Sequence, residues 1–132
     1  MYEVGVVQQF EAAHRLEGNF GPATRTHGHT YKVEVAVRGE RLQGDGTLCD
    51  IGQLGEALKN AIGELHLQDL NALEAFGGRN TTAEVVAEHI LGRVRPSLPP
   101  TGLSAITVRV WESPNAYAAV EETMNRPRQR LV

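Results

Sequence analysis

Three histidines have the spacing expected of a single metal site. His14 ends a period-two stretch over residues 2–14, and His27 and His29 begin another over residues 27–38. Alternate residues of a β-strand point to the same side, so all three imidazoles would share the side that carries the apolar residues. If the two strands form an antiparallel hairpin, the end of the first lies beside the start of the second, and the three rings converge.

Three neutral imidazoles leave one tetrahedral position open, which is typical of catalytic zinc rather than structural zinc. A zinc ion with an open position can polarise a carbonyl or hydroxyl oxygen. H-x-H is a weak motif by itself, and an inward histidine is often an ordinary core residue, so the residues alone leave both interpretations open. Of the other histidines, we expect His66 in a loop after the first helix and His89 on the surface of the second helix.

The sequence predicts two strands, two helices and two further strands, and the first two strands would position these histidines. Period-two alternation predicts the strands, and apolar residues at helical spacing predict the helices. The predicted order is β-β-α-α-β-β, with strands over residues 2–14, 27–38, 103–112 and 116–122 and helices over residues 51–65 and 83–95.

Polar residues at the expected helix starts support this order. Asp50 precedes the first helix and predicts its N-cap, and Thr81 or Thr82 can cap the second. Thr81 and Glu84 also have the spacing of a capping box.

Adjacent strands with short connections favour an antiparallel sheet with both helices on one face, which is an α+β fold. The opposite face of the sheet is too mixed to be a second core. A lone four-stranded sheet would also leave two edges open. We therefore expect oligomerisation through the sheet edges.

Length and composition indicate one ordinary domain. The chain has 132 residues, 41% of them hydrophobic and 22% charged, with a net charge of -3. We expect a single domain over residues 1–124 and a basic tail over residues 125–132. The acidic balance argues against a nucleic-acid partner. No leader pattern or membrane-length apolar run is evident, and Cys49 is the only cysteine, so we expect a cytoplasmic protein in which Cys49 is a small buried hydrophobe.

Six short motifs, taken in order, resemble one known family. They are F-E-A-A-H-R-L at 10–16, H-G-H-T-Y at 27–31, D-I-G-Q-L at 50–54, L-N at 70–71, T-A-E at 82–84 and W-E-S at 111–113. No single motif is specific, but the ordered set over about residues 4–122 resembles the 6-pyruvoyl-tetrahydropterin synthase family, which includes the 6-carboxy-tetrahydropterin synthases of the queuosine pathway.

The resemblance implies a fold, an assembly and a ligand. The fold would be the tunnelling fold (T-fold), in which three subunits join their sheets into a barrel and two trimers stack as a homohexamer, with the active sites between subunits. By the same resemblance, His14, His27 and His29 match the zinc ligands. Glu112 matches the glutamate that anchors the pterin ring, and a carboxylate can accept two N–H groups from such a ring.

The resemblance also places Thr82 and Asp50 near the ligand pocket. Both residues have the helix-cap interpretation given above, and a residue can serve both roles.

The positions that the family uses for proton transfer are changed. The family has a catalytic cysteine four residues before H-G-H, and this sequence has Ala23 there. The family's L-D-H-x-x-L-N places an acid–base pair where this chain has His66 and Leu67. Alanine and leucine have no titratable atom, so no catalytic residue is carried over from the family.

We therefore expect a homologue that binds a pterin or related heterocycle but does not run the 6-pyruvoyl-tetrahydropterin synthase reaction. An alternative is an active zinc-dependent lyase on a dihydroneopterin-triphosphate-like substrate. Its rearranged acid–base set would be His66, Asp69 and Glu17. A structural or regulatory subunit without a ligand is a third possibility, against which the carboxylate of Glu112 argues, because burying it unpaired is costly.

Overall fold

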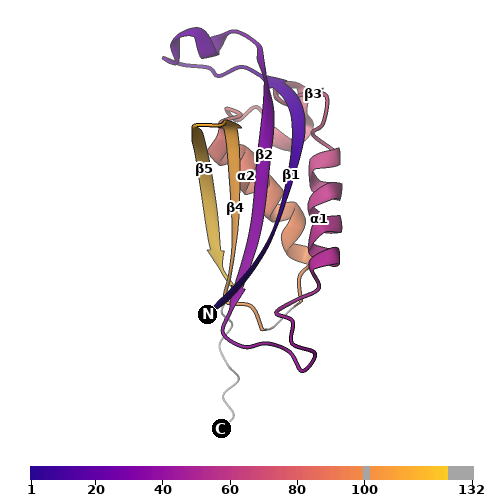
Figure 1. The fold of residues 1–132 in the computed structure, drawn as a ribbon. Helices are drawn as coiled ribbons and strands as arrows, with labels where there is room; N and C mark the ends of the chain where they lie inside the picture. Colours follow the sequence, from indigo (N-terminus) through magenta and orange to yellow (C-terminus); the bar gives the residue numbers. More distant parts are fainter. Residues whose placement is uncertain (100–101, 125–132) are drawn as a thin grey trace.

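One open sheet with two helices against one of its faces forms the fold (Figure 1). The computed structural model describes residues 1–99 and 102–124, so the basic tail predicted over residues 125–132 lies outside the described residues. The strands are β1 (Tyr2–His14), β2 (His27–Gly39), β3 (Gln68–Asp69), β4 (Ala105–Ser113) and β5 (Ala116–Thr123). The α-helices are α1 (Ile51–Gly63) and α2 (Ala83–Val94), and the short 3-10 helices are η1 (Gly21–Thr24), η2 (Leu70–Ala72), η3 (Glu74–Phe76) and η4 (Arg95–Ser97).

The predicted α+β order is confirmed, with one addition. The strand order is β3-β1-β2-β4-β5. Neighbouring strands pair antiparallel, except that β3 pairs in parallel with the end of β1. The sequence did not predict β3, because two residues are too short to show a period. The sheet is open, with β3 and β5 at its edges in the described part of the chain.

The apolar side chains of the strands and helices meet in one core between the sheet and the helices. The valines of β2 are fully buried, and they face the buried stripes of both helices. The other face of the sheet carries polar contacts, as predicted: the Trp111 indole donates to the Glu34 carboxylate at 3.0 Å, and Arg109 lies 3.6 Å from the same carboxylate. The core therefore covers one face only.

Two of the predicted N-caps are present in the structure. Asp50 caps α1, because its carboxylate accepts the N–H groups of Gly52 and Gln53 at 2.9 and 3.2 Å. Thr82 caps α2 by accepting the N–H of Val85 at 3.2 Å. The predicted capping box of Thr81 and Glu84 is wrong, because α2 begins one residue later than that box requires.

The predicted burial is right for Cys49 and wrong for His89. Cys49 is buried, with 6% of its surface exposed, as predicted. The surface position predicted for His89 is wrong: its side chain is only 12% exposed, and its ring lies 5.0 Å from that of Phe76, centroid to centroid. Burial, and next the charge of Arg93, lower the pKa of His89. A histidine beside an apolar stripe can fill a gap between a helix and a preceding turn, which a helical wheel does not show.

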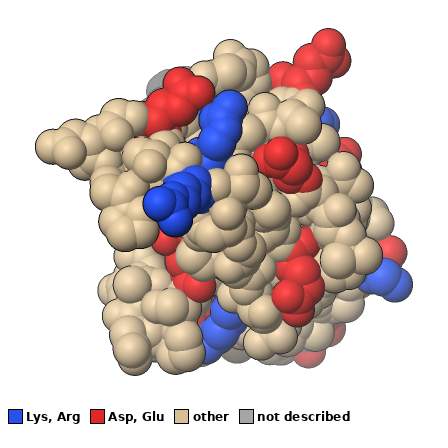
Figure 2. Space-filling view, turned by 90° about the horizontal axis from the view of Figure 1, so that it is seen from above, with Lys and Arg blue, Asp and Glu red and all other residues tan. Residues whose placement is uncertain are grey.

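The end of the molecule seen from above carries both acidic and basic side chains. Figure 2 shows acidic and basic side chains scattered there among uncharged ones. None of the described helices combines the length and apolar character needed to cross a membrane.

Candidate functional site

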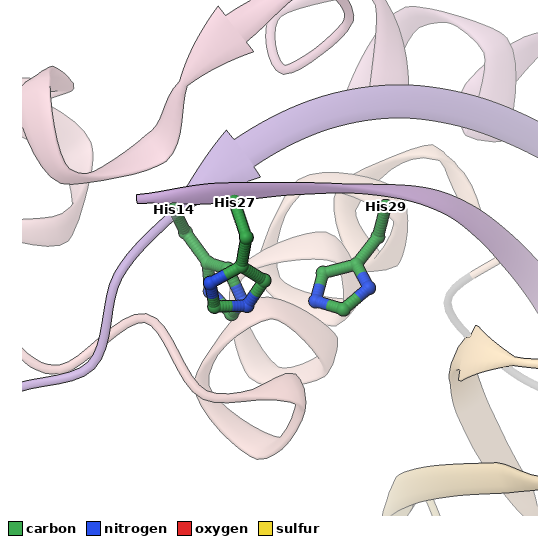
Figure 3. A group of neighbouring side chains, drawn as sticks. All are labelled: His14, His27 and His29. Carbon is green, nitrogen blue, oxygen red and sulfur yellow. The ribbon is translucent and has the colours of Figure 1, made fainter. Parts of the chain in front are cut away.

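The hairpin of β1 and β2 brings the three predicted histidines together. His14 pairs with His27 in the antiparallel register, and Ala12 pairs with His29. The ring centroids are 4.6 Å apart for His14 and His27, 5.0 Å for His14 and His29, and 4.8 Å for His27 and His29. Figure 3 shows the three rings on the same side of the two strands. The parity argument from the sequence thus places them correctly relative to one another.

Hydrogen bonds to backbone carbonyls orient two of these rings. Nδ1 of His14 lies 2.7 Å from the Thr81 carbonyl oxygen, and Nδ1 of His27 lies 2.7 Å from the Arg25 carbonyl oxygen. A carbonyl only accepts, so each Nδ1 carries the proton and each Nε2 presents a lone pair. Such an outer hydrogen bond is the usual support of a metal-binding histidine.

The donor set fits a zinc ion. The candidate ligand atoms of the three histidines lie within 4.8 Å of one another. Tetrahedral zinc with bonds of about 2.0–2.1 Å requires nitrogens roughly 3.3 Å apart, so small ring movements would close the site. Nε2 of His29 is buried and has no hydrogen-bond partner among the described residues. A buried nitrogen without a partner is costly unless something binds it.

His14 has the protonation state that a metal ligand needs. Its side chain is 1% exposed, and this burial is the largest effect, which lowers its pKa. The hydrogen bond to Thr81 and the charge of Glu112 oppose that effect, and the other two histidines add to it. The net direction is a lowered pKa, so His14 is neutral near pH 7.

A chain of side chains holds His14 from behind, and the sequence analysis missed it. The Asn71 amide accepts the N–H of Arg15 at 2.8 Å and donates to the carbonyl of Arg15 at 3.0 Å. The buried Thr81 hydroxyl lies 3.3 Å from Oδ1 of Asn71 and 3.2 Å from Nδ1 of His14. Asn71 thus fixes the chain that follows His14 as well as the threonine that orients its ring. The L-N motif marked the position but not this role.

Glu112, which the resemblance matches to a ligand-anchoring glutamate, lies beside the histidines. Oε2 of Glu112 is 4.0 Å from Nε2 of His14, and its side chain is 30% exposed. The pairing of β4 with β5 shifts between Trp111 and Ser113, so Glu112 occupies an irregularity of the strand. Such irregularities often redirect a side chain next to a functional site.

The other two predicted ligand residues lie in different places. Thr82 directly follows Thr81, whose carbonyl oxygen contacts His14. The hydroxyl of Thr82 caps α2. Asp50 lines a groove together with Tyr2 and Glu3, at the start of the strand that ends with His14. A thirteen-residue strand extends on the order of 40 Å, so one subunit does not bring Asp50 to the histidines.

The altered family positions have structural roles in this chain. Ala23 lies in η1, and its carbonyl accepts the N–H of Leu16 at 2.9 Å, which joins η1 to the chain that follows His14. Nδ1 of His66 accepts the N–H of Glu11 at 3.1 Å, at the edge of the sheet. Leu67 is 74% exposed, and its φ of 63° is the only positive value of a non-glycine residue in the described chain.

The two remaining candidate acids are also held by local contacts. The Asp69 carboxylate accepts the N–H of Asn71 at 3.1 Å. Glu17 forms an exposed ion pair with Arg15 at 3.4 Å, while Asn80 clamps its backbone. Asp69 and His29 line one hollow of about 500 Å³, and Glu17 does not line it.

The open sheet, the two helices on one face and the three-histidine cluster define a domain of the T-fold class. The sequence model of the 6-pyruvoyl tetrahydropterin synthase family matches residues 3–123. The chain belongs to this family. A putative 6-carboxy-5,6,7,8-tetrahydropterin synthase of Pyrococcus horikoshii is 30% identical, with 89% of this chain and 88% of the relative covered. The 6-carboxy-5,6,7,8-tetrahydropterin synthase of Haemophilus influenzae is 25% identical, with 92% and 100% covered.

Solved structures share the fold. The 6-pyruvoyl tetrahydropterin synthase of Caenorhabditis elegans superposes with a TM-score of 0.79 at 24% identity, covering 92% of this chain and 96% of that one. A Plasmodium vivax 6-pyruvoyltetrahydropterin synthase in which a catalytic glutamate is replaced by alanine gives a TM-score of 0.76 at 19% identity, with 92% and 98% covered. In that Plasmodium protein, therefore, a carboxylate is a catalytic residue.

Proposed function

We propose that this protein binds a pterin or a related heterocycle through Glu112, next to zinc held by His14, His27 and His29. The observation that carries the proposal is the position of the Glu112 carboxylate. It is half-buried, and its only ion-pair contact within 4.0 Å among residues 1–99 and 102–124 is the imidazole of His14. Because His14 is neutral near pH 7, no described side chain compensates the charge of the carboxylate, which leaves that role to bound zinc and to the ligand. A ring with two adjacent N–H groups would satisfy it.

The three histidines supply what a zinc site requires from the protein. Two of them are fixed as Nδ1–H tautomers, and the third presents a buried free nitrogen. Bound zinc would supply a Lewis acid that polarises a ligand oxygen. The protein's own contribution is to orient the rings from behind and to keep water away from His14.

We further propose that the protein does not carry out the 6-pyruvoyl-tetrahydropterin synthase reaction. Ala23 and Leu67 offer no atom that exchanges a proton. His66 is the only titratable group at the three altered positions, and its Nδ1 is engaged with the sheet edge. General acid–base groups contribute about 10²–10⁴-fold each, so losing them removes most of the rate.

A second candidate function is a lyase with a different acid–base group. Asp69 favours it, because Asp69 and His29 line the same hollow. The catalytic glutamate of the Plasmodium relative supports the idea that a carboxylate can act in this fold. His66 and Glu17 are weaker candidates, since neither shares a contact with the histidine cluster in the described residues.

The proposed assembly is a cytoplasmic homohexamer of two stacked trimers, with the ligand between subunits. The open sheet edges support it, because closing them by pairing removes unpaired backbone groups. An assembly would also allow Asp50 of one subunit to approach the histidines of another. Sedimentation of the purified protein tests this, and a monomer at micromolar concentration would refute it.

Titration of the zinc-loaded protein with biopterin tests the ligand, and metal analysis of the protein as purified tests the zinc. Glu112→Gln removes the charge and should weaken binding at least tenfold, because hydrogen bonds to charged groups are the stronger ones. Glu56→Gln, which changes an exposed carboxylate on α1, is the matched control. Equal affinities of wild type and Glu112→Gln would refute the proposal.

Incubation with dihydroneopterin triphosphate, followed by chromatography, decides between the two functions. No product above the background rate supports the binding function. Turnover that Asp69→Asn abolishes would establish the lyase instead.

A further inference from the structure

Tyr31 carries a hydroxyl group that the core does not need. Its side chain is fully buried in β2, and its ring stacks on Phe10 with centroids 4.7 Å apart. The centroid of the Tyr31 ring also lies 5.3 Å from that of His29 and 6.1 Å from that of His14, in edge-on arrangements. The hydroxyl oxygen is buried and has no hydrogen-bond partner among the described residues. A phenylalanine would keep every one of these ring contacts without the cost of an unpaired polar group.

The sheet register brings Tyr31 near Glu112. Lys32 of β2 pairs with Trp111 of β4, and Tyr31 and Glu112 are the residues that continue the two strands beyond this pair. Both side chains are on the inner face, since Tyr31 is in the core and Glu112 approaches His14. Cross-strand neighbours on one face have Cβ atoms about 4.5–5.5 Å apart, which is within reach of a tyrosine and a glutamate side chain.

We propose that Tyr31 is a positioning residue that donates its hydroxyl hydrogen bond to the Glu112 carboxylate when a ligand occupies the site. This inference rests on the proposed function of Glu112. A carboxylate has about four lone-pair positions, so it can accept the Tyr31 hydroxyl and still accept two N–H groups from a heterocycle. The hydroxyl would hold the carboxylate in one orientation, which a glutamate at an irregular strand position otherwise lacks.

Tyr31 would then discriminate between ligands by acting through Glu112. A correctly held carboxylate accepts a ligand with two parallel N–H donors better than a ligand with one. The expected ligand class is a 2-amino-pyrimidinone ring, as in pterins and guanine-like heterocycles, in preference to a ring that lacks the amino group.

Tyr31→Phe tests the inference in the zinc-loaded protein, with Tyr117→Phe as the matched control. Tyr117 is exposed on β5, so its hydroxyl should not matter. We expect Tyr31→Phe to weaken biopterin binding roughly tenfold, as for loss of one hydrogen bond to a charged group, and to leave the melting temperature equal to or above that of the wild type. A structural role alone would change the melting temperature and not the affinity.

A crystal structure of the wild-type complex supplies the second measurement. The expected distance from the Tyr31 oxygen to a Glu112 carboxylate oxygen is about 2.5–3.0 Å. If the wild type binds biopterin and Tyr31→Phe binds it equally well, the inference is overturned and the proposed function stands. A Tyr31 hydroxyl that contacts the ligand directly or nothing at all also overturns it. If the wild type binds no biopterin, both proposals fail.

Discussion

Replacing Asn71 by alanine should loosen the metal site from behind without touching a metal ligand. The amide of Asn71 forms two hydrogen bonds with the backbone of Arg15 and a third, longer one with Thr81. At about 1 kcal/mol for each of the two shorter bonds, and less for the third, the variant should lose about 2–3 kcal/mol of unfolding free energy. For a domain of this size, that corresponds to a fall of roughly 10 °C in the melting temperature.

The same substitution should weaken zinc binding by about tenfold. Thr81 orients His14, and loss of an outer hydrogen-bond partner costs a metal site about 10–100-fold in affinity. We expect the lower end of this range of affinity loss, because Asn71 acts on His14 only through Thr81. Competition with a chromophoric chelator measures the affinity, and differential scanning calorimetry measures the stability.

Asn80→Ala is the matched control for this experiment. Asn80 holds the backbone of Glu17 with the same pair of bonds, at 2.8 and 2.9 Å, and within residues 1–99 and 102–124 its side chain forms no hydrogen bond with Thr81. We expect this variant to lose some stability and to keep its zinc affinity within about twofold. Unchanged zinc affinity in Asn71→Ala, or an equal loss in both variants, would refute the reasoning.

Three further substitutions follow from the cap, the buried histidine and the strained loop. Thr82→Ala should cost about 1 kcal/mol in urea unfolding through loss of the α2 N-cap, and unchanged biopterin affinity would show that capping is its only role. Because burial lowers the pKa of His89, the unfolded chain binds a proton near pH 6.5 that the folded chain does not. The unfolding free energy should therefore fall as the pH drops from 7.5 to 5.5, and His89→Gln should reduce that fall, leaving the part due to His14. Leu67→Asn should raise the unfolding free energy by about 1 kcal/mol in urea titrations, because asparagine tolerates a positive φ better than leucine does; a decrease would show that the Leu67 side chain is buried in the assembly.

The sequence predicted the fold and the histidine cluster because both depend on local periodicity. Strand parity alone places His14, His27 and His29 on one face, and the hairpin register then brings them together. The roles of Thr81 and Asn71 could not be predicted in this way. Their contacts join residues 56 to 67 positions apart, and such contacts leave no periodic signal. The position of Asp50 at the other end of the sheet could not be predicted either, because the order of motifs along the sequence does not give the distance between their residues in the fold.

The residues that would move protons and those that would hold the metal have changed differently in this chain. Each of the two histidines that end β1 and begin β2 keeps a carbonyl partner at 2.7 Å, and the buried support behind His14 is complete. His66, in contrast, has its Nδ1 on the backbone of Glu11, and the next residue donates its N–H to the same strand. These two bonds continue the sheet edge into β3, so this segment gains a structural role at the positions where the family places its acid–base pair. The bond at Nδ1 fixes the ring of His66 and leaves its Nε2 as the nitrogen that carries a proton. The complete ring supports behind the histidines favour the proposed binding function, which does not require that His66 transfer a proton.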